Sequence, residues 1–344
     1  MVPFKFNLAL FAVACSSYLA ACQPELPDIS GSTMGTTYSL QLPRLNETDQ
    51  HKLISSEVET LLREINSAMS TYQSDSAISL FNRSESLSWS PVPDSFATVA
   101  DYALSVARQS RGALDPTVGP LVRRWGFGAE HATVPPPENE LEKLLEHTGY
   151  QQLQVQLEPP SLRKIKPQIQ IDLSAIAKGY AVDKIADLVE TYGFKNYLVE
   201  IGGELRGRGN NRHNEPWTIG IEQPDAEGIV VKQALTLTAG GVATSGDYRN
   251  FIEADGVRYS HIIDPRTGYP VTHLLAAVTV VAESAMQADA WATALMVLGV
   301  EEGLRTADHQ QLAAYFIYRN DNGLVGVASS KFAKLDIQQS VSGN

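Results

Sequence analysis

Residues 217–238, WTIGIEQPDAEGIVVKQALTLT, contain two segments whose composition favours β-strands. Trp217–Glu222 and Ala234–Thr238 are rich in β-branched and aromatic residues and are typical of strands. The link between them contains Pro224, Asp225 and Gly228, which are residues that turns select. A parallel crossover needs a dozen or more residues, usually a helix, so this pair is predicted to be antiparallel.

The same kind of pattern extends in both directions along the chain. Further strands are predicted at Thr37–Leu42, Leu153–Leu157, Gln168–Leu173, Tyr197–Ile201, Asn250–Glu253 and Ala277–Ala282. Helices are predicted at Asp49–Met69, Ser95–Gln109, Asn139–Thr148, from Ser174 to a stop at Gly193, and from Ala285 to Leu298, ended by Gly299. This order predicts an α+β fold of mostly antiparallel sheets flanked by helices, not a doubly wound parallel sheet.

The composition is that of an ordinary globular protein. Of 344 residues, 43% are apolar and 19% are charged, which excludes disordered, collagen-like and coiled-coil classes. The 27 basic and 39 acidic side chains give a net charge of −12. So acidic a chain does not favour binding to a phosphate backbone, and we expect no nucleic-acid partner. An anionic ligand must then be held locally, by backbone amides or a metal.

The N-terminal residues are typical of an export signal. After Lys5 comes an uncharged run, Asn7–Ala21, that is too short to span a membrane. It ends in Leu19-Ala20-Ala21-Cys22, which is similar to a bacterial lipobox. Both cysteines of the chain lie in this segment, so no disulfide and no Cys-based zinc site is expected in the folded part.

These features predict the domain organisation. We expect a lipoprotein signal peptide at 1–21, a tether at 22–30 after a lipidated (palmitate-bearing) Cys22, a folded domain at 31–335 and a C-terminal tail at 336–344. Gln23 favours the outer membrane of a bacterial envelope, facing the periplasm, with the inner membrane as the other possibility. An ordinary signal peptide with an incidental Cys22 is the alternative.

The common nucleotide, zinc and hydrolase signatures are missing from the sequence. It has no Gly-x-x-x-x-Gly-Lys-Ser/Thr, His-Glu-x-x-His or Gly-x-Ser-x-Gly motif, and its seven histidines are scattered. We therefore expect any metal to be a hard ion held by oxygen atoms.

A first polar cluster lies at the predicted strand-to-helix junction near residue 172. The strand is predicted to end at Asp172, Ser174 to cap the helix, and Lys178 to lie one turn into it. Helix-start amides together with Lys178 favour an anion. A simple N-cap with a solvated lysine is the alternative.

A second cluster lies on the predicted helix that starts at Ala285. Asp289 and Thr293 are four residues apart, so their oxygens share one helix face and can hold one ion. The neighbours are mostly alanine, and a carboxylate buried there needs a cation or a donor. The alternative has Asp289 in solvent and Thr293 bonded to its own helix.

Two further features complete the set. His261 precedes the turn Asp264–Gly268, a place that suits a general base, although a lone histidine on a strand is more often structural. Glycine-bearing loops carry Met34 and the run Ala113, Leu114 and Asp115, and Tyr72 follows a helix, so these residues could contact a ring or a phosphate.

Taken in order, the motifs resemble one family. They are GSTMGT (31–36), MSTY (69–72), GALDPTVGPL (112–121), WGFG (125–128), DLSAIAKGYA (172–181), GGEL (202–205), ATSGDY (243–248), SHIIDPRTG (260–268) and ADAWATAL (288–295). From Gly31 to about Leu324 the chain is similar to the ApbE family of flavin transferases, which act as FAD:protein FMN transferases and are commonly exported lipoproteins.

The resemblance implies a magnesium enzyme that moves FMN from FAD to a Ser or Thr hydroxyl of a partner flavoprotein, such as those of membrane redox complexes, and releases AMP. It implies that FAD is lined by Met34, Tyr72, Ala113, Leu114, Asp115, Asp172, Lys178 and Ile263. It also implies that Mg²⁺ is held by Asp289, Thr293 and the carbonyl of Ala175, with His261 as the base. Ala175 has no side-chain ligand, and Ala292 stands where relatives often have an acid, so the number of ions, one or two, is left open.

Two other functions remain open from the sequence. If water attacks the same phosphorus, the chain is an FAD pyrophosphatase that forms FMN and AMP. If no reaction occurs, it is a passive FAD-binding lipoprotein.

Overall fold

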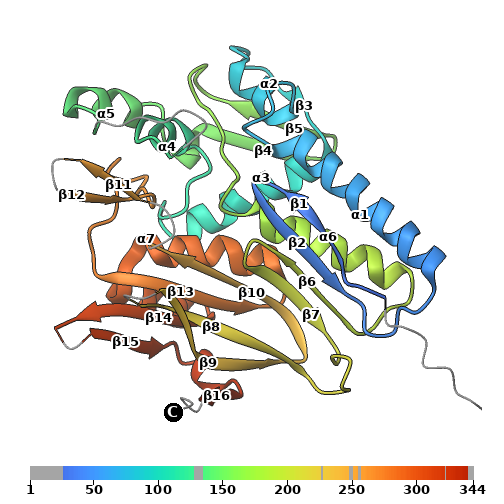
Figure 1. Ribbon diagram of the computed structural model, residues 1–344. Helices are drawn as coiled ribbons and strands as arrows, with labels where there is room; N and C mark the ends of the chain where they lie inside the picture. The colour runs from blue at the N-terminus through green and yellow to red at the C-terminus, as the bar shows by residue number, and fades with distance from the viewer. Residues whose placement is uncertain are drawn as a thin grey trace, which may run out of the picture.

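A large antiparallel sheet is the centre of the computed structural model, which describes residues 26–127, 135–225, 228–247, 251–254, 257–321 and 323–339. Its eight strands lie in the order β1-β2-β6-β7-β10-β13-β14-β15, and every neighbouring pair is antiparallel (Figure 1). Their bounds are β1 Ile29–Thr33, β2 Thr36–Gln41, β6 Tyr197–Ile201, β7 Glu204–Arg208, β10 Ala239–Gly246, β13 Leu275–Ala282, β14 Ala313–Asn320 and β15 Gly323–Ala328. The predicted α+β class is confirmed.

Different layers cover the two faces of this sheet. The helices α6 (Ala177–Thr191) and α7 (Ala285–His309) pack on one face, against β6, β7, β10 and β13 (Figure 1). On the other face lies the smaller sheet β16-β9-β8, formed by β8 (Trp217–Asp225), β9 (Gly228–Leu237) and β16 (Ile337–Gln339). Trp217, Leu235 and Leu237 pack there with Val242 of β10. The pair quoted from the sequence, β8 and β9, is antiparallel as predicted.

The remaining elements surround the helical side. The helices are α1 (Thr48–Met69), α2 (Ala77–Arg83), α3 (Asp94–Gln109), α4 (Gly119–Arg124) and α5 (Glu138–Leu145). Short strands form the sheet β3-β5-β4 (Ser90–Pro91, Pro160–Lys164, Leu153–Leu157) and the hairpin β11–β12 (Phe251–Ala254, Val257–Ser260), and 3₁₀ turns lie at Tyr150–Gln152 and Phe332–Lys334. Apolar side chains of α1, α3, α6, α7 and the large sheet share one core.

Glycine allows α7 to begin close to its neighbours. A Cβ on Gly179 of α6 would lie 2.4 Å from the carbonyl oxygen of Ala285, and a Cβ on Gly241 of β10 would lie 2.3 Å from the Ala285 nitrogen. Asp183 of α6 then accepts hydrogen bonds from the backbone N–H groups of Ala285 and Met286, each at 2.9 Å. The start of α7 is therefore fixed against both α6 and the sheet.

The predicted strand Gln168–Leu173 is wrong. Its alternating burial is real, since Ile169, Ile171 and Leu173 are buried, but the segment belongs to no sheet. The Asn82 side chain instead accepts from the Ile171 N–H at 2.7 Å and donates to the Ile171 carbonyl at 2.8 Å. The Asn82 side-chain amide thus makes the backbone hydrogen bonds of Ile171 that a neighbouring strand would make in a sheet.

A buried lysine also holds this segment. Lys164 of β5 is 1% exposed, and its Nζ donates to the carbonyls of Asn82, Pro167 and Ile169 at 3.0–3.4 Å. Burial lowers the pKa of Lys164, and its ammonium also lies 5.2 Å from the centre of the Phe81 ring. The chain leading to Asp172 is therefore fixed by α2 and β5.

Several predicted boundaries also need correction. Ser174 does not cap α6: Ile176 has a non-helical φ of −152°, and the helix begins at Ala177. The predicted helix to Thr148 ends at Leu145, where the chain leaves through i to i+3 turns. Gly299 has a non-helical conformation (φ 73°) and ends the first helical segment of α7 as predicted, but a second segment follows it directly, up to His309.

The folded domain is longer than predicted at both ends. Ile29 of β1 is buried in the core, so folding begins before residue 31, and β16 pairs with β9 beyond residue 335. The predicted signal peptide and Cys22 lie outside the described residues. No helix in the part of the chain that the structure describes is long and apolar enough to cross a membrane.

Candidate active site

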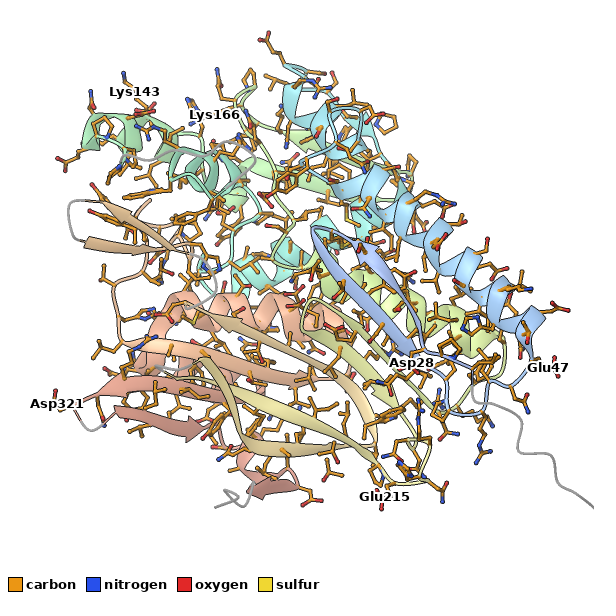
Figure 2. The ribbon with its side chains drawn as sticks, viewed as in Figure 1. Asp28, Glu47, Lys143, Lys166, Glu215 and Asp321 are labelled. Atoms are coloured by element: carbon orange, nitrogen blue, oxygen red, sulfur yellow. The ribbon has the colours of Figure 1, made fainter. Side chains whose placement is uncertain are left out.

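Three elements bring two carboxylates and one ammonium together. Glu204 at the start of β7 is 4% exposed and Asp289 of α7 is 3% exposed. The Nζ of Lys178, in the first turn of α6, lies 2.8 Å from Oε2 of Glu204 and 3.8 Å from Oδ1 of Asp289. Several other charged side chains are exposed to solvent, in contrast to these buried carboxylates. Figure 2 labels six such residues around the rim of the molecule: Asp28, Glu47, Lys143, Lys166, Glu215 and Asp321.

Burial changes the acidity of both carboxyl groups. Burial, and then the nearby charge of Asp289, raise the pKa of Glu204 to about 7, although Lys178 opposes the shift. Burial likewise raises the pKa of Asp289, against the charge of Lys178 and the hydrogen bond from the Gly179 N–H. Two buried acids with one ammonium form a site that a further cation would stabilise.

The oxygen atoms near Asp289 fit a hard divalent ion. Oδ2 of Asp289 accepts from the Gly179 N–H at 3.0 Å, while Thr293 lies one turn further along α7, with its hydroxyl 3.4 Å from that of Ser245. Ala175 lies in the turn just before α6. In the described ranges, no group of three or more His, Cys, Asp or Glu that could hold a metal occurs.

The loop after α3 lies against the segment before α6. The Asp172 N–H donates to the Pro116 carbonyl at 2.7 Å, and a Cβ on Gly119 would lie 3.2 Å from the Asp172 Cβ. Because Pro116 directly follows Asp115, this hydrogen bond holds the loop that contains Ala113–Asp115 next to the backbone of Asp172.

The Asp115 carboxylate is occupied inside its own loop. Oδ1 accepts from the Thr117 N–H at 2.8 Å and from its hydroxyl at 2.6 Å, and Oδ2 accepts from the Tyr150 N–H at 2.7 Å. Burial raises the pKa of Asp115, and these hydrogen bonds oppose the rise. Its side chain therefore shapes the loop, while Ala113 and Leu114 are also buried.

A second Asp-Pro-x-x-Gly turn follows His261. Asp264 accepts from the Arg266 N–H at 2.9 Å, as Asp115 does from Thr117 two residues on, so the two turns share one hydrogen-bond pattern. The His261 ring lies 6.2 Å from that of Phe127. Ile263 is buried with Leu121 and Trp125, so its side chain belongs to the core beneath this segment.

Two further predicted site residues, Met34 and Tyr72, flank the N-terminal elements: Met34 lies between β1 and β2, and Tyr72 follows α1. Met34 (φ 50°) and Gly35 (φ 75°) form the tight turn of the β1–β2 hairpin. Asn66 near the end of α1 donates to the Thr33 hydroxyl at 3.0 Å and so ties this turn to the helix that precedes Tyr72. The Tyr72 side chain is 71% exposed. The Tyr72 ring is thus accessible from solvent.

A comparison with protein-family models covers most of this chain. The family model described as "ApbE family" matches residues 34–316. The chain belongs to the ApbE family.

Relatives and solved structures of the ApbE family are similar over nearly the whole chain. An FAD:protein FMN transferase of Vibrio cholerae is 43% identical over 94% of this chain and 97% of its own, and one of Haemophilus influenzae is 42% identical over 96% and 98%. The flavin transferase ApbE structure from Vibrio cholerae has a TM-score of 0.82 at 42% identity, covering 90% of this chain and 99% of its own. The apo flavinyl transferase ApbE of Pseudomonas stutzeri has a TM-score of 0.83 at 38% identity, covering 90% and 96%.

Two acids near this ApbE-family site are not among the residues predicted from sequence. Glu204 lies in the motif GGEL, but a single acid after two glycines gives no signal of burial. Asp183 lies within α6 and fixes the start of α7. A carboxylate on the buried stripe of a helix was a possible signal for Asp183, whereas only the tertiary structure shows the partner of Glu204.

Proposed function

We propose that this chain is an FAD:protein FMN transferase. The observation that carries the proposal is the cluster of Lys178, Asp289 and Thr293 at the facing starts of α6 and α7, in a chain with close relatives of that name. A fixed ammonium beside oxygen ligands suits the diphosphate of FAD. The substrates would be FAD and the Ser or Thr hydroxyl of a partner flavoprotein.

The reaction is a displacement at the FMN phosphorus. The acceptor hydroxyl oxygen forms a new bond to that phosphorus, the bond to the bridging oxygen breaks, and AMP leaves with the bridging oxygen. His261 is the proposed base that receives the hydroxyl proton. The enzyme's main contribution is to orient the two reactants and to offset the charge that develops on the phosphoryl oxygens.

The remaining predicted residues would bind FAD. Lys178 would contact the phosphates, and Met34 and Tyr72 would contact apolar ring surface. Asp172, Ile263 and the run Ala113–Asp115 would line the same ligand, with Asp115 acting through the shape of its loop.

A magnesium ion would be held by Asp289, Thr293 and the Ala175 carbonyl. Bound there, Mg²⁺ would neutralise charge on the diphosphate. Two features support this ion: the Asp289 carboxylate is buried, and all three proposed ligand atoms are oxygens, which Mg²⁺ prefers.

We also propose that the chain is a lipoprotein of the bacterial envelope. The lipobox-like Leu19–Cys22 supports a lipid on Cys22, and Gln23 favours the outer membrane, facing the periplasm. The acceptors would then be flavoproteins of membrane redox complexes. Replacing Cys22 with Ser should abolish incorporation of labelled fatty acid; labelling that persists would refute the lipid anchor.

One incubation tests the reaction. The chain from Gln23 onward is mixed with FAD, Mg²⁺ and a candidate acceptor that carries an Asp-x-x-Ser/Thr-Gly-Ala-Thr type motif. In-gel flavin fluorescence on the acceptor, together with AMP release, supports the transferase. AMP without labelled acceptor would instead identify an FAD pyrophosphatase, and bound FAD with neither product would identify a passive flavin-binding protein.

A further inference from the structure

Glu204 makes a closer contact with Lys178 than Asp289 does. The Nζ of Lys178 lies 2.8 Å from Oε2 of Glu204, which is a hydrogen-bonding distance, but 3.8 Å from Oδ1 of Asp289, which is not. Oδ2 of Asp289 is already bonded to the Gly179 N–H. Of the two carboxylates, Glu204 therefore makes the closer ion pair with the Lys178 ammonium, and Oδ1 of Asp289 lies further from it.

The turn between β6 and β7 places Glu204 on the correct face of the sheet. Gly202 (φ 61°) and Gly203 (φ 104°) make this turn, and the Gly203 N–H donates to Oε1 of Glu200 at 2.6 Å. The next residue, Leu205, packs with Trp217 and Leu237 on the opposite face. Because side chains alternate along a strand, Glu204 faces α6 and α7.

Lys178 needs such a partner. Its long flexible side chain is 28% exposed and lies beside a buried carboxylate of opposite charge. Without Glu204, the ammonium would gain from direct contact with Asp289, and it would then compete with a divalent cation for Oδ1.

We propose that Glu204 is a positioning residue that holds the Lys178 ammonium away from Asp289, so that Asp289 remains available to a divalent cation and Lys178 to a phosphate. This rests on the proposed function for the identity of the ligands. The position of Lys178 itself does not depend on that function and can be tested separately.

The direct test is a crystal structure of Glu204→Gln in the metal-free full-length protein. The amide can accept a hydrogen bond but carries no charge, so Lys178 should move to hydrogen-bonding distance of Asp289. Lys178 remaining beside residue 204 would overturn the proposal. Glu200→Gln, which also removes one acid and can still accept from Gly203, is the matched control and should leave Lys178 in place.

Metal binding gives a second measurement without FAD or acceptor. Mn²⁺ affinity, measured by calorimetry, should fall on the order of tenfold in Glu204→Gln, as is typical for coupling between contacting charges, and remain unchanged in Glu200→Gln. In a Lys178→Met background, Glu204→Gln should change the affinity by less than about twofold. An equal loss in both backgrounds would mean that Glu204 acts on the cation directly, and would refute a role through Lys178.

The remaining outcomes separate this proposal from the proposed function. If Glu204→Gln does not fold, Glu204→Asp keeps the charge but shortens the reach, and should show a smaller shift of Lys178 in the same direction. If the wild-type chain binds no Mn²⁺ or transfers no FMN, the proposed function fails, and the Glu204→Gln structure alone decides the position of Lys178. If transfer occurs but Lys178 does not move, the positioning role fails.

Discussion

Glu204 and Asp289 are ordinary carboxyl groups that the fold removes from water. Their chemistry is set by what surrounds them: apolar helix and sheet, one ammonium, and one backbone N–H. Exposed acids such as Glu47 share the residue type but none of these surroundings. At this scale, burial and partner explain reactivity better than residue identity does.

The raised pKa of Glu204 predicts a pH-dependent stability of the metal-free chain. Between its ordinary value of 4.5 and its folded value of about 7, Glu204 holds its proton in the folded state but releases it on unfolding. Stability should therefore fall as pH rises through this window, by roughly 1.4 kcal/mol per pH unit at most. Urea unfolding across the window should show a smaller slope for Glu204→Gln. An unchanged slope would mean that Glu204 titrates normally.

His261 should affect chemistry rather than binding. His261→Ala removes the proposed base but leaves Lys178 and Asp289 in place, so FAD affinity, measured by flavin fluorescence, should be retained. Transfer to the acceptor should fall by about 10²–10⁴-fold, as is typical of general-base removal. A near-normal transfer rate would indicate a structural histidine.

Among the helices, α7 carries two of the three predicted metal ligands, Asp289 and Thr293, on one face. Asp289→Asn keeps the size of the side chain but removes its charge, so transfer should be lost while the helix stays folded. Excess Mg²⁺ should partly restore the rate, because mass action refills a weakened site. Thr293→Val should show a milder dependence on Mg²⁺. Normal transfer at limiting Mg²⁺ together with a lowered melting temperature would make Asp289 a structural group.

The close packing of α6 against α7 predicts an unusually costly glycine substitution. In Gly179→Ala the new Cβ would lie 2.4 Å from the Ala285 carbonyl oxygen, so the two helices must separate, at a cost of about 3 kcal/mol. Gly193→Ala, after the end of the same helix, has a positive φ but no atom within 4 Å, and should cost only about 1 kcal/mol. Urea unfolding measures both. A cost at position 179 no larger than that at position 193 would show that the α6–α7 contact adjusts to the added methyl group.

At the scale of the whole molecule, periodicity predicted the long elements well. β4 and β6 match their predicted bounds, and α1 begins one residue earlier than expected. The seven-residue α2 is too short to show a helical period, and the segment 168–173 has the burial of a strand without a partner strand. The sequence could not show that the Asn82 side chain bonds to Ile171, because 89 residues separate them. Lys164 is only five residues from Ile169, but a lysine gives no local signal that its side chain is buried.

The sequence singled out some residues near the candidate site and missed others. Asp289, Lys178 and Thr293 were predicted as site residues because helix spacing or family motifs single them out, and the structure places Lys178 beside Asp289. Glu204 was not predicted as a site residue, because its proposed role depends on a contact between β7 and α6 that the sequence does not show. Local pattern identifies a residue's element; it does not identify the residue across from it.

The attachment of the segment before Asp172 has a consequence for the order of folding. Asn82 bonds to Ile171 across 89 residues, so the backbone leading to Lys178 cannot be fixed until α2 has docked against it. Contacts of such long sequence separation form late, since closing the loop costs entropy before any contact offsets it. During refolding, helical circular dichroism should recover before FAD binding, and Asn82→Ala should lengthen this delay, whereas Asn46→Ala at an exposed position should not. A freshly made chain would thus pass through a state that is folded in outline but still unable to bind flavin.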